Sequence, residues 1–229
     1  MLEKIKKEMY NMKNEEKAKI SSKFFKTGPG EYGEGDKFLG ISVPETRKIA
    51  KEYVSVDFNE LKILLNSDIH EFRLLAVLIL VEKYQTSSNK EGVVKFYLDN
   101  TEKVNNWDLV DLSAYKILGD YIKDRDRKII YKLAKSKNLW EKRISIISTF
   151  AFILNNQFDD TLEISKILLN DKHDLIQKAV GWMLREVGKR DIKVEETFLR
   201  KYYKKMPRTM LLYAIERFPK KQREYYLTK

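Results

Sequence analysis

Apolar residues recur at three- and four-residue steps along most of the chain. Leu61, Leu64 and Leu65 follow this spacing, and so do the apolar positions between Phe72 and Leu80. Such a period places the apolar side chains on one face of an α-helix. Alternating apolar runs bounded by tight turns, which are typical of strands, find little support. The pattern therefore predicts an all-α fold.

Short polar breaks divide these helices into pairs. Positions near the start of the second helix recur at steps of 37, 33 and 33 residues, and 34 more reach Pro207. These positions are His70, Trp107, Trp140 and His173. The predicted first helices are Phe58–Leu65, Val93–Leu98, Arg127–Lys135, Leu162–Leu169 and Glu195–Tyr203. One pair cannot bury its own apolar face, so neighbouring pairs must stack. We therefore predict an α-solenoid of HEAT-like helical-pair repeats, forming a curved stack with a concave groove.

The chain has one glycine-dense stretch, from Gly28 to Asp36. We interpret residues 28–40 as a loop that follows an N-terminal helical hairpin formed by residues 1–27. The stretch contains the spacing G-x-G-x-x-G, but no strand precedes it and its acidic residues would repel a pyrophosphate, so a dinucleotide site is rejected. Because no linker interrupts the later repeats, residues 1–229 are predicted to form a single domain.

Composition excludes several classes of chemistry. The chain has no cysteine, so disulfides, thiolate metal sites and thiol nucleophiles are absent. The longest apolar run, Leu74 to Val81, is too short to cross a bilayer, and no signal segment opens the chain. The two histidines, His70 and His173, fit helix caps and are expected to be structural. We expect a cytoplasmic protein without metal or cofactor.

The charge is strongly basic, with 45 Lys and Arg against 34 Asp and Glu. Residues 189–229 alone hold 13 basic and five acidic residues. This asymmetry favours a polyanionic partner, because each neutralised phosphate releases counterions. The alternative is a solvated basic face without a partner. The charge therefore supports a polyanionic partner only when it is considered together with a candidate site.

Tryptophan occurs only three times, and each one lies in or near the first turn of a repeated helix. If the second helices line the concave side, one set of side chains projects towards one groove: Arg73, Trp107, Asp111, Arg143 and Trp182. Asp111 follows Trp107 by four residues, so both share one helical face. An aromatic face, a carboxylate and a guanidinium could together hold a cationic, sugar-linked group against a phosphate.

Each of these residues also has a purely structural explanation. Trp107 and Trp182 could be core aromatics at helix contacts. Asp111 could be an exposed helix residue, and Arg143 could belong to a surface ion pair with an acidic neighbour. Trp140 is assigned to packing because its helical neighbours are apolar.

Four ordered motifs carry a resemblance to a known family. They are Phe25–Ile41, Asn106–Asp111, Trp140–Arg143 and Gly181–Lys189. With these motifs the chain resembles the HEAT-like DNA alkylation repair glycosylases of the AlkD type, over most of its length. That family excises N-alkylated purines, particularly 7-methylguanine and 3-methyladenine, from duplex DNA without a metal or cofactor.

The resemblance implies a role for individual residues. Trp107, Asp111, Arg143 and Trp182 fall on the catalytic and lesion-site positions, and Arg185 falls on a DNA-contacting position. Lys189, Arg190 and the loop residue Tyr32 are further expected DNA contacts. The implied partner is duplex DNA containing alkylated bases. We also expect the protein to be a monomer.

The chemistry also follows from the substrate. A cationic alkylated purine is already a good leaving group, and cleavage of its glycosidic bond develops oxocarbenium character on deoxyribose. A carboxylate such as Asp111 stabilises this charge and can align the attacking water. The indoles of Trp107 and Trp182 suit a cationic base, and Arg143 can grip a phosphate with two hydrogen bonds.

Two other functions stay open. The first is a non-catalytic HEAT-like protein that recognises DNA shape, or branched or single-stranded DNA. The second is a helical scaffold for an acidic protein, which leaves Asp111 and the indoles without a role. For the glycosylase, no lysine stands out as a Schiff-base nucleophile, so we expect hydrolysis to an abasic site without strand cleavage.

Overall fold

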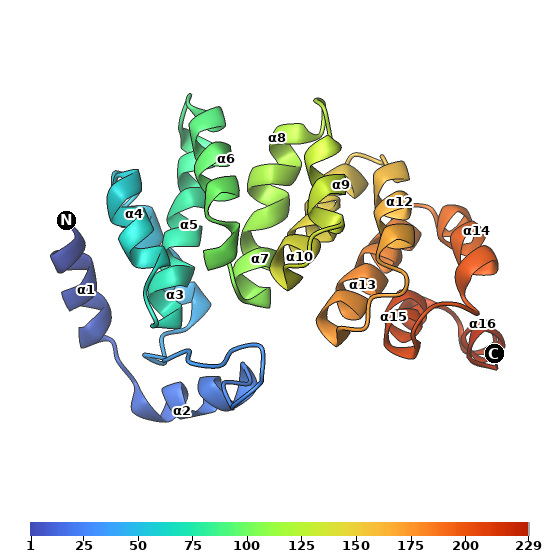
Figure 1. The fold of residues 1–229 in the computed structure, drawn as a ribbon, viewed down its shortest axis with the longest axis horizontal. Helices are drawn as coiled ribbons and strands as arrows, with labels where there is room; N and C mark the ends of the chain where they lie inside the picture. Colours follow the sequence, from blue (N-terminus) through green and yellow to red (C-terminus); the bar gives the residue numbers. More distant parts are fainter. Residues whose placement is uncertain (229) are drawn as a thin grey trace. The chain divides into compact units, whose positions relative to one another are not determined.

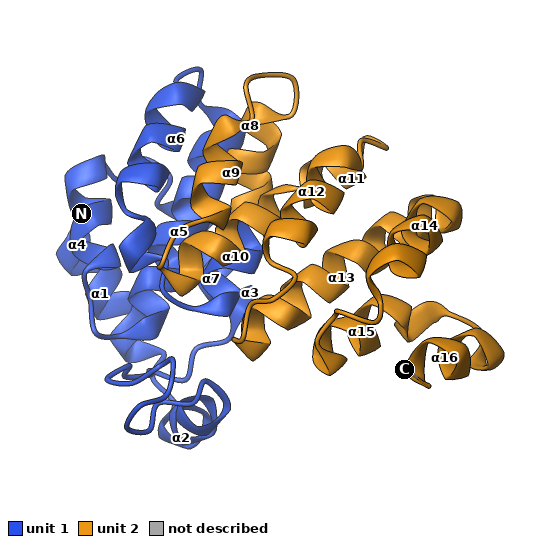
Figure 2. Cartoon of the chain, turned by 45° about the vertical axis from the view of Figure 1, so that its right-hand side comes forward, with its two compact units in different colours: residues 1–113 blue, residues 114–229 orange. Residues whose placement is uncertain are grey.

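The computed structural model describes residues 1–228 and divides the chain into two compact units, residues 1–113 and 114–229 (Figure 2). Within the described part, regular structure is helical, and the only β-type pairing is an isolated bridge between Lys37 and Ile69. The predicted all-α class is confirmed. The prediction of a single domain stays a prediction, and each unit is described separately below.

Unit 1 is built around one buried helix (Figure 1). Its helices are α1 (Leu2–Asn11), α2 (Glu15–Phe24), α3 (Val43–Glu52), α4 (Phe58–Leu65), α5 (His70–Thr86), α6 (Lys90–Asp99), the short 3-10 helix η1 (Thr101–Lys103) and α7 (Trp107–Ala114), whose last residue belongs to unit 2. Every residue of α5 from His70 to Val81 is buried, because α3, α4 and α6 pack against it. A helix that is apolar nearly all round requires such burial.

Unit 2 continues the pairing. It contains the π-helical turn η2 (Tyr115–Gly119), α8 (Asp120–Ile122), α9 (Lys128–Ala134), α10 (Leu139–Ser148), α11 (Phe150–Ile153), α12 (Asp159–Ile167), α13 (Asp174–Arg190), α14 (Ile192–Tyr202), α15 (Arg208–Ala214), the 3-10 helix η3 (Ile215–Arg217) and α16 (Lys220–Leu227). The most extensive helix contact in this unit joins α13 to α15. It depends on Gly181, where a Cβ atom would meet the Met210 carbonyl oxygen at 2.4 Å.

The predicted helix pairs are present. The helix over Phe58–Leu65 has the predicted bounds, and the other four predicted first helices correspond to α6, α9, α12 and α14. Side-chain caps start several of them: the Asp57 carboxylate accepts from the Glu60 N–H, and the Asn138 side chain accepts from the Trp140 N–H. His173 is the N-cap of α13 and accepts from the Leu175 N–H, as expected for a structural cap.

The N-terminal hairpin prediction needs correction. Two helices do form within residues 1–27, but α2 buries none of its residues, and it does not pack along α1 (Figure 1). Instead, α1 buries Ile5 and Met9, and Glu8 accepts a hydrogen bond from the Tyr53 hydroxyl beyond α3. The helix α2 therefore stands as an exposed element beside the glycine-rich loop.

One helix of unit 1, α3, was missing from the predicted pairs. Its sequence signal is a capping box in which Ser42 and Glu45 bond reciprocally, with Pro44 in the first turn. Only Thr46, Ile49 and Ala50 of this helix are buried, so its apolar pattern is short and easily overlooked.

Candidate functional site

Trp107 begins α7 and lies in an aromatic cluster of unit 1. The Phe25 ring stacks on the indole with centroids 5.2 Å apart and planes at 19°. Phe24 meets the indole edge-on at 5.8 Å, and Phe24 itself is 62% exposed. The indole Nε1–H donates to the Tyr32 hydroxyl at 3.3 Å. Trp107 stays partly exposed, so it is not a sealed core aromatic.

A buried ionic cluster, formed by Asp36, His70, Arg73 and Asp108, fixes the start of α7 and the end of the glycine-rich loop. His70 Nε2 lies 2.8 Å from the Asp108 carboxylate, and its Nδ1 lies 3.5 Å from Asp36. The Arg73 guanidinium donates to the same Asp36 carboxylate at 2.6 Å. These side chains are all nearly inaccessible to solvent. Loop and helix are thus joined through one imidazole.

This cluster corrects two predictions. His70 is not a helix cap: Ile69 caps α5, and the His70 ring, 2% exposed, lies between two carboxylates. Arg73 does not project into an open groove, because it is buried against Asp36 and donates to the Ser67 carbonyl. Both buried residues fix the start of α7 and the end of the glycine-rich loop.

The His70 cluster predicts a pH-dependent stability. Burial lowers the pKa of His70, but the Asp108 charge and hydrogen bond and the contact with Asp36 outweigh it and raise the pKa to about 9. Because the pKa is higher in the folded state, the protonated His70 stabilises the fold. This stabilisation is fully present below about pH 6.5 and is lost as the pH rises to about 9. Between pH 6 and pH 9, we expect the free energy of unfolding of the wild-type protein to fall by at least ~1 kcal/mol more than that of His70→Gln. Urea unfolding of both proteins at the two pH values measures this difference. If the free energies of unfolding of wild type and His70→Gln fall equally, His70 is not the cause of the pH dependence.

Asp111 and Asp108 lie on α7 but face different surroundings. Asp108 is buried against His70, whereas Asp111 is partly exposed, one turn after Trp107. The Asp111 charge also acts on the buried Tyr97 ring, and together with burial it raises the pKa of Tyr97. Asp111 is therefore the carboxylate of α7 that solvent reaches.

The second predicted tryptophan lies in unit 2. Trp182 is partly exposed, its indole N–H donates to Glu186 at 3.0 Å, and its ring lies 6.2 Å from that of Phe150. Phe150 in turn meets Tyr115 edge-on at 5.2 Å. Trp182 stands in the middle of α13, not in its first turn, because α13 begins at Asp174. The prediction of a first-turn position was wrong for this residue.

Arg143 is 5% exposed, and its guanidinium donates to the Leu175 carbonyl in the first turn of α13 at 2.6 Å. The side chain thus ties α10 to α13. The contact of Arg143 with a phosphate stays a prediction. Only a small part of this side chain is accessible for such a contact. Trp140 is 8% exposed, in keeping with its assignment to packing.

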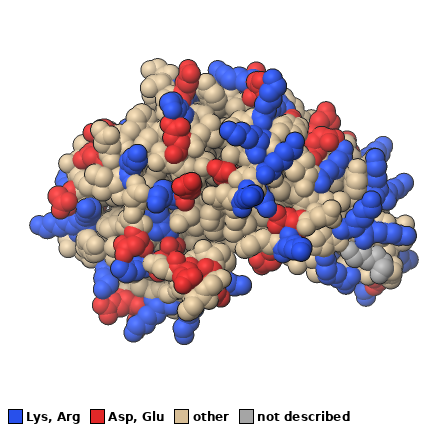
Figure 3. All heavy atoms as spheres, in the orientation of Figure 1, with Lys and Arg blue, Asp and Glu red and all other residues tan. Residues whose placement is uncertain are grey.

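The predicted DNA-contacting cations of α13 are partly neutralised by carboxylates. Arg185 forms an ion pair with Glu216, and Lys189 contacts both carboxylate oxygens of Glu186 at 2.7 and 2.8 Å. Arg190, at the end of α13, is exposed. Figure 3 shows further Lys and Arg side chains gathered over the C-terminal helices of unit 2.

A carboxyl group is buried behind this surface. Burial of Glu195 raises its pKa to about 9, against the smaller opposing effect of Arg185. Its carboxyl group packs on Gly188, where any Cβ atom would overlap it. Glu195 therefore helps to join α14 to α13, and it is not exposed for chemistry.

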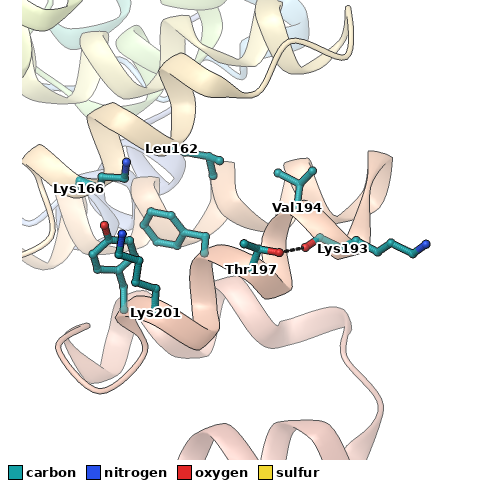
Figure 4. A pocket seen from close by; sticks show the side chains of 8 residues that line it. Leu162, Lys166, Lys193, Val194, Thr197 and Lys201 are labelled. Carbon is teal, nitrogen blue, oxygen red and sulfur yellow. Dashed lines mark hydrogen bonds between the residues drawn. The ribbon is translucent and has the colours of Figure 1, made fainter.

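A pocket of about 380 Å³ lies between α12 and α14 (Figure 4). Its lining is Leu162, Lys166, Lys193, Val194, Thr197, Phe198, Lys201 and Tyr202. The Thr197 hydroxyl donates to the Lys193 carbonyl, and Lys166 pairs with Glu163. None of the predicted site residues lines it, so the candidate chemistry does not depend on this pocket.

Comparison with known proteins identifies the family. The sequence signature described as "DNA alkylation repair enzyme" matches residues 5–218. The chain belongs to this family. A solved structure described as a predicted DNA alkylation repair enzyme from Enterococcus faecalis is similar, with 20% identity and a TM-score of 0.71, covering 91% of this chain and 97% of its own. AlkD2 from Streptococcus mutans has 21% identity and a TM-score of 0.56, covering 79% and 91%. Among proteins of curated function, none matches significantly.

These comparisons confirm the family resemblance and the all-α helical-repeat class of the fold. The family is described as a DNA alkylation repair enzyme, which supports an enzyme role in DNA alkylation repair for this chain. Over residues 1–228, no helix is both long and apolar enough to cross a membrane. The roles of individual residues rest on the geometry above.

Sequence reasoning missed three residues around Trp107. Phe25 begins the matched motif Phe25–Ile41 and Phe24 directly precedes it, but neither was singled out, and Asp108 was considered only as part of the motif Asn106–Asp111. A double aromatic preceding a glycine-rich loop was the available signal for the first pair. For Asp108 the only signal was its position beside Trp107 at the start of α7.

Proposed function

We propose that this chain is a monofunctional DNA glycosylase that hydrolyses the N-glycosidic bond of cationic alkylated purines, such as 7-methylguanine and 3-methyladenine, in duplex DNA. Water adds to C1′ of the sugar and loses a proton to solvent. The bond from C1′ to the base nitrogen breaks and its electron pair stays on the nitrogen, so the cationic base leaves uncharged and an abasic site remains. Family membership supports the reaction class. The observation that carries the proposal is the partly exposed Trp107 with Asp111 one turn along the same helix.

The substrate provides its own activation. N-alkylation gives the purine a positive charge, so no acid is needed to protonate the leaving group. The positive charge that develops on the sugar is what the enzyme must stabilise. A single partly exposed carboxylate such as Asp111 suits this role, and it can also orient the attacking water.

The indoles supply recognition. Trp107 is held by Phe25 and Tyr32, and Trp182 is held by its hydrogen bond to Glu186. Rings fixed in this way offer π faces to a cationic base at low entropic cost, with an attraction of about 0.5–2 kcal/mol each.

Basic residues supply affinity for the phosphate backbone. Arg185 and Lys189 are paired with Glu216 and Glu186, and in the proposal both cations turn from these carboxylates to backbone phosphates when DNA binds. Arg190 and the surplus of Lys and Arg after residue 189 add a long-range attraction. Binding is therefore expected to weaken steeply with salt.

Release of methylated purines from methylated duplex DNA tests the proposal. We expect purified protein to liberate 7-methylguanine and 3-methyladenine, separated by chromatography, and to leave abasic sites without strand breaks. The same protein on unmethylated DNA is the control. If the chain binds the DNA in a salt-dependent manner but liberates no base, it is a non-catalytic DNA-binding protein and the glycosylase proposal fails.

A further inference from the structure

The pocket between α12 and α14 has no role in the proposed chemistry, but its lining is regular (Figure 4). Two rows of side chains on α14 form one wall, and the members of each row are four residues apart. The apolar row is Val194, Phe198 and Tyr202. The polar row is Lys193, Thr197 and Lys201. Residues four positions apart share one helical face, so α14 presents two parallel stripes to the pocket.

Apolar surface in this pocket is open to solvent. Val194 and Tyr202 are partly exposed, and so is Leu162, which lines the pocket from α12. Phe198 is buried, and its ring lies 4.7 Å from that of Tyr202. The volume of about 380 Å³ is within the range of ligand pockets, which is about 300–1,000 Å³. Covering the apolar surface removes it from water and therefore favours binding.

The preceding pair of first helices, α9 and α12, is joined directly by side chains. The Asp160 carboxylate of α12 accepts from Arg127, at the start of α9, at 2.5 Å and from the Tyr131 hydroxyl at 2.7 Å. The Arg127 guanidinium also lies over the Phe152 ring, 4.1 Å from its centroid. Within residues 1–228, no hydrogen bond or ion pair of this kind joins α12 to α14. The pocket is therefore a place where the chain leaves two neighbouring helices without such a link.

Lysines stand at both ends of the pocket, with Lys193 at one end and Lys201 and Lys166 at the other (Figure 4). Lys193 and Lys201 are exposed, and neither pairs with a carboxylate in the part of the chain that the structure describes. Lys166 pairs with Glu163, which lies outside the lining. Lys193 and Lys201 are eight positions apart on α14, which is about 12 Å along the helix axis. The pocket is thus apolar along its length and positively charged at either end.

The apolar row distinguishes this pocket from a contact with the DNA backbone. Phosphates bind lysines, but they gain nothing from Val194, Leu162 or Tyr202. The candidate site residues of unit 2, Arg143 and Trp182, belong to α10 and α13, the second helices of their pairs, which pack on each other. The pocket is built only from first helices, α12 and α14. A partner that uses its whole lining must have both apolar and acidic side chains.

We propose that the α12–α14 pocket binds a protein partner through an amphipathic helix that carries apolar side chains between two carboxylates. This helix lies along α14, with its apolar face on Val194, Leu162 and Tyr202 and its carboxylates at Lys193 and Lys201. Helices laid side by side have the same rise per residue, so the two carboxylates are about two turns apart, like the two lysines. The inference does not depend on base excision.

Fluorescence anisotropy with the full chain and labelled synthetic helical peptides tests this docking site. The probe peptide carries leucines along one face and a glutamate at each end of that face. One control peptide replaces the leucines with serine, and the other replaces the glutamates with lysine. We expect the probe to bind at least about tenfold more tightly than either control, because it alone matches both rows. Equal Kd values for the probe and the serine peptide would overturn the inference, because charge alone would then explain the binding.

A charge reversal locates the bound peptide. In the double variant Lys193→Glu, Lys201→Glu, the probe should bind about tenfold more weakly or worse, and the lysine peptide should gain affinity. The matched control Lys132→Glu, Lys135→Glu makes the same change of charge at exposed positions of α9 and its C-cap, and should leave the Kd of the probe within about twofold of wild type.

Two results would contradict the location or the kind of partner. If both double variants weaken the probe equally, the peptide responds to net charge and the pocket has no role. If unmodified duplex DNA displaces the probe from the wild-type chain at low concentration, the surface belongs to DNA and the proposed protein partner is wrong.

Discussion

Asp111→Asn is expected to reduce base excision about 10²- to 10³-fold, because it removes the carboxylate that stabilises the developing charge on the sugar. The amide has nearly the same shape, so the packing around Tyr97 should persist. Affinity for duplex DNA is expected to stay level or rise, since one negative charge near the phosphates is lost. Single-turnover excision and a binding titration with the same duplex measure both effects.

Asp124→Asn is the matched control for this variant. Asp124 is exposed in the turn after α8, and its substitution makes the same change of charge. Excision by this variant should stay within about twofold of wild type. If both variants lose activity equally, the effect belongs to net charge, and Asp111 has no catalytic role. Weaker binding by Asp111→Asn, without activity in either form, would favour a DNA-binding protein.

Glu71→Ala is expected to destabilise the fold by about 3 kcal/mol or more. The Glu71 carboxylate is 2% exposed and accepts from the backbone N–H groups of Leu39, Gly40 and Ile41 at 2.8–3.3 Å. Removing it leaves three amide donors without their acceptor, and each loses a charge-assisted bond. Gly40 tolerates no side chain, because a Cβ atom would meet the Asn14 carbonyl at 2.2 Å, so the segment cannot shift to compensate.

Urea unfolding measures this loss, with two variants for comparison. Glu71→Gln keeps one carbonyl acceptor and should fall between wild type and Glu71→Ala. Glu82→Ala, at a partly exposed position of the same helix, should change stability by less than about 0.5 kcal/mol. A Glu71→Ala protein as stable as Glu82→Ala would show that the carboxylate is not what holds residues 39–41.

The helix pairs could be predicted because the signals for each helix lie within a short stretch of sequence. The helix at Phe58–Leu65 has an apolar stripe, an Asp57 cap and a polar break after it, and all three signals act within a few residues. The start of α13 at His173 was also predicted, from the polar break before it, but Trp182 was wrongly placed in the first turn of its helix. Trp182 lies more than two turns after the cap at His173.

The surroundings of the candidate residues depended on tertiary packing. Asp36, His70 and Asp108 come from a loop and two helices, and His70 and Asp108 are separated by 38 positions in the sequence. No local sequence pattern predicts that two carboxylates will contact one imidazole. The contact of Arg73 with Asp36 is equally non-local, which is why Arg73 was expected in the groove. Spacing on one helix did foresee the pair Trp107 and Asp111, because a four-residue step fixes their common face.

The most direct measurement is the yield of free base from a duplex carrying one N7-methylguanine, incubated with excess protein and quantified by mass spectrometry. We expect one free 7-methylguanine for each abasic strand, with the strand intact. Asp111→Asn should almost abolish this yield on the same time scale. A wild-type protein that saturates this duplex while every lesion stays attached to its sugar would contradict it.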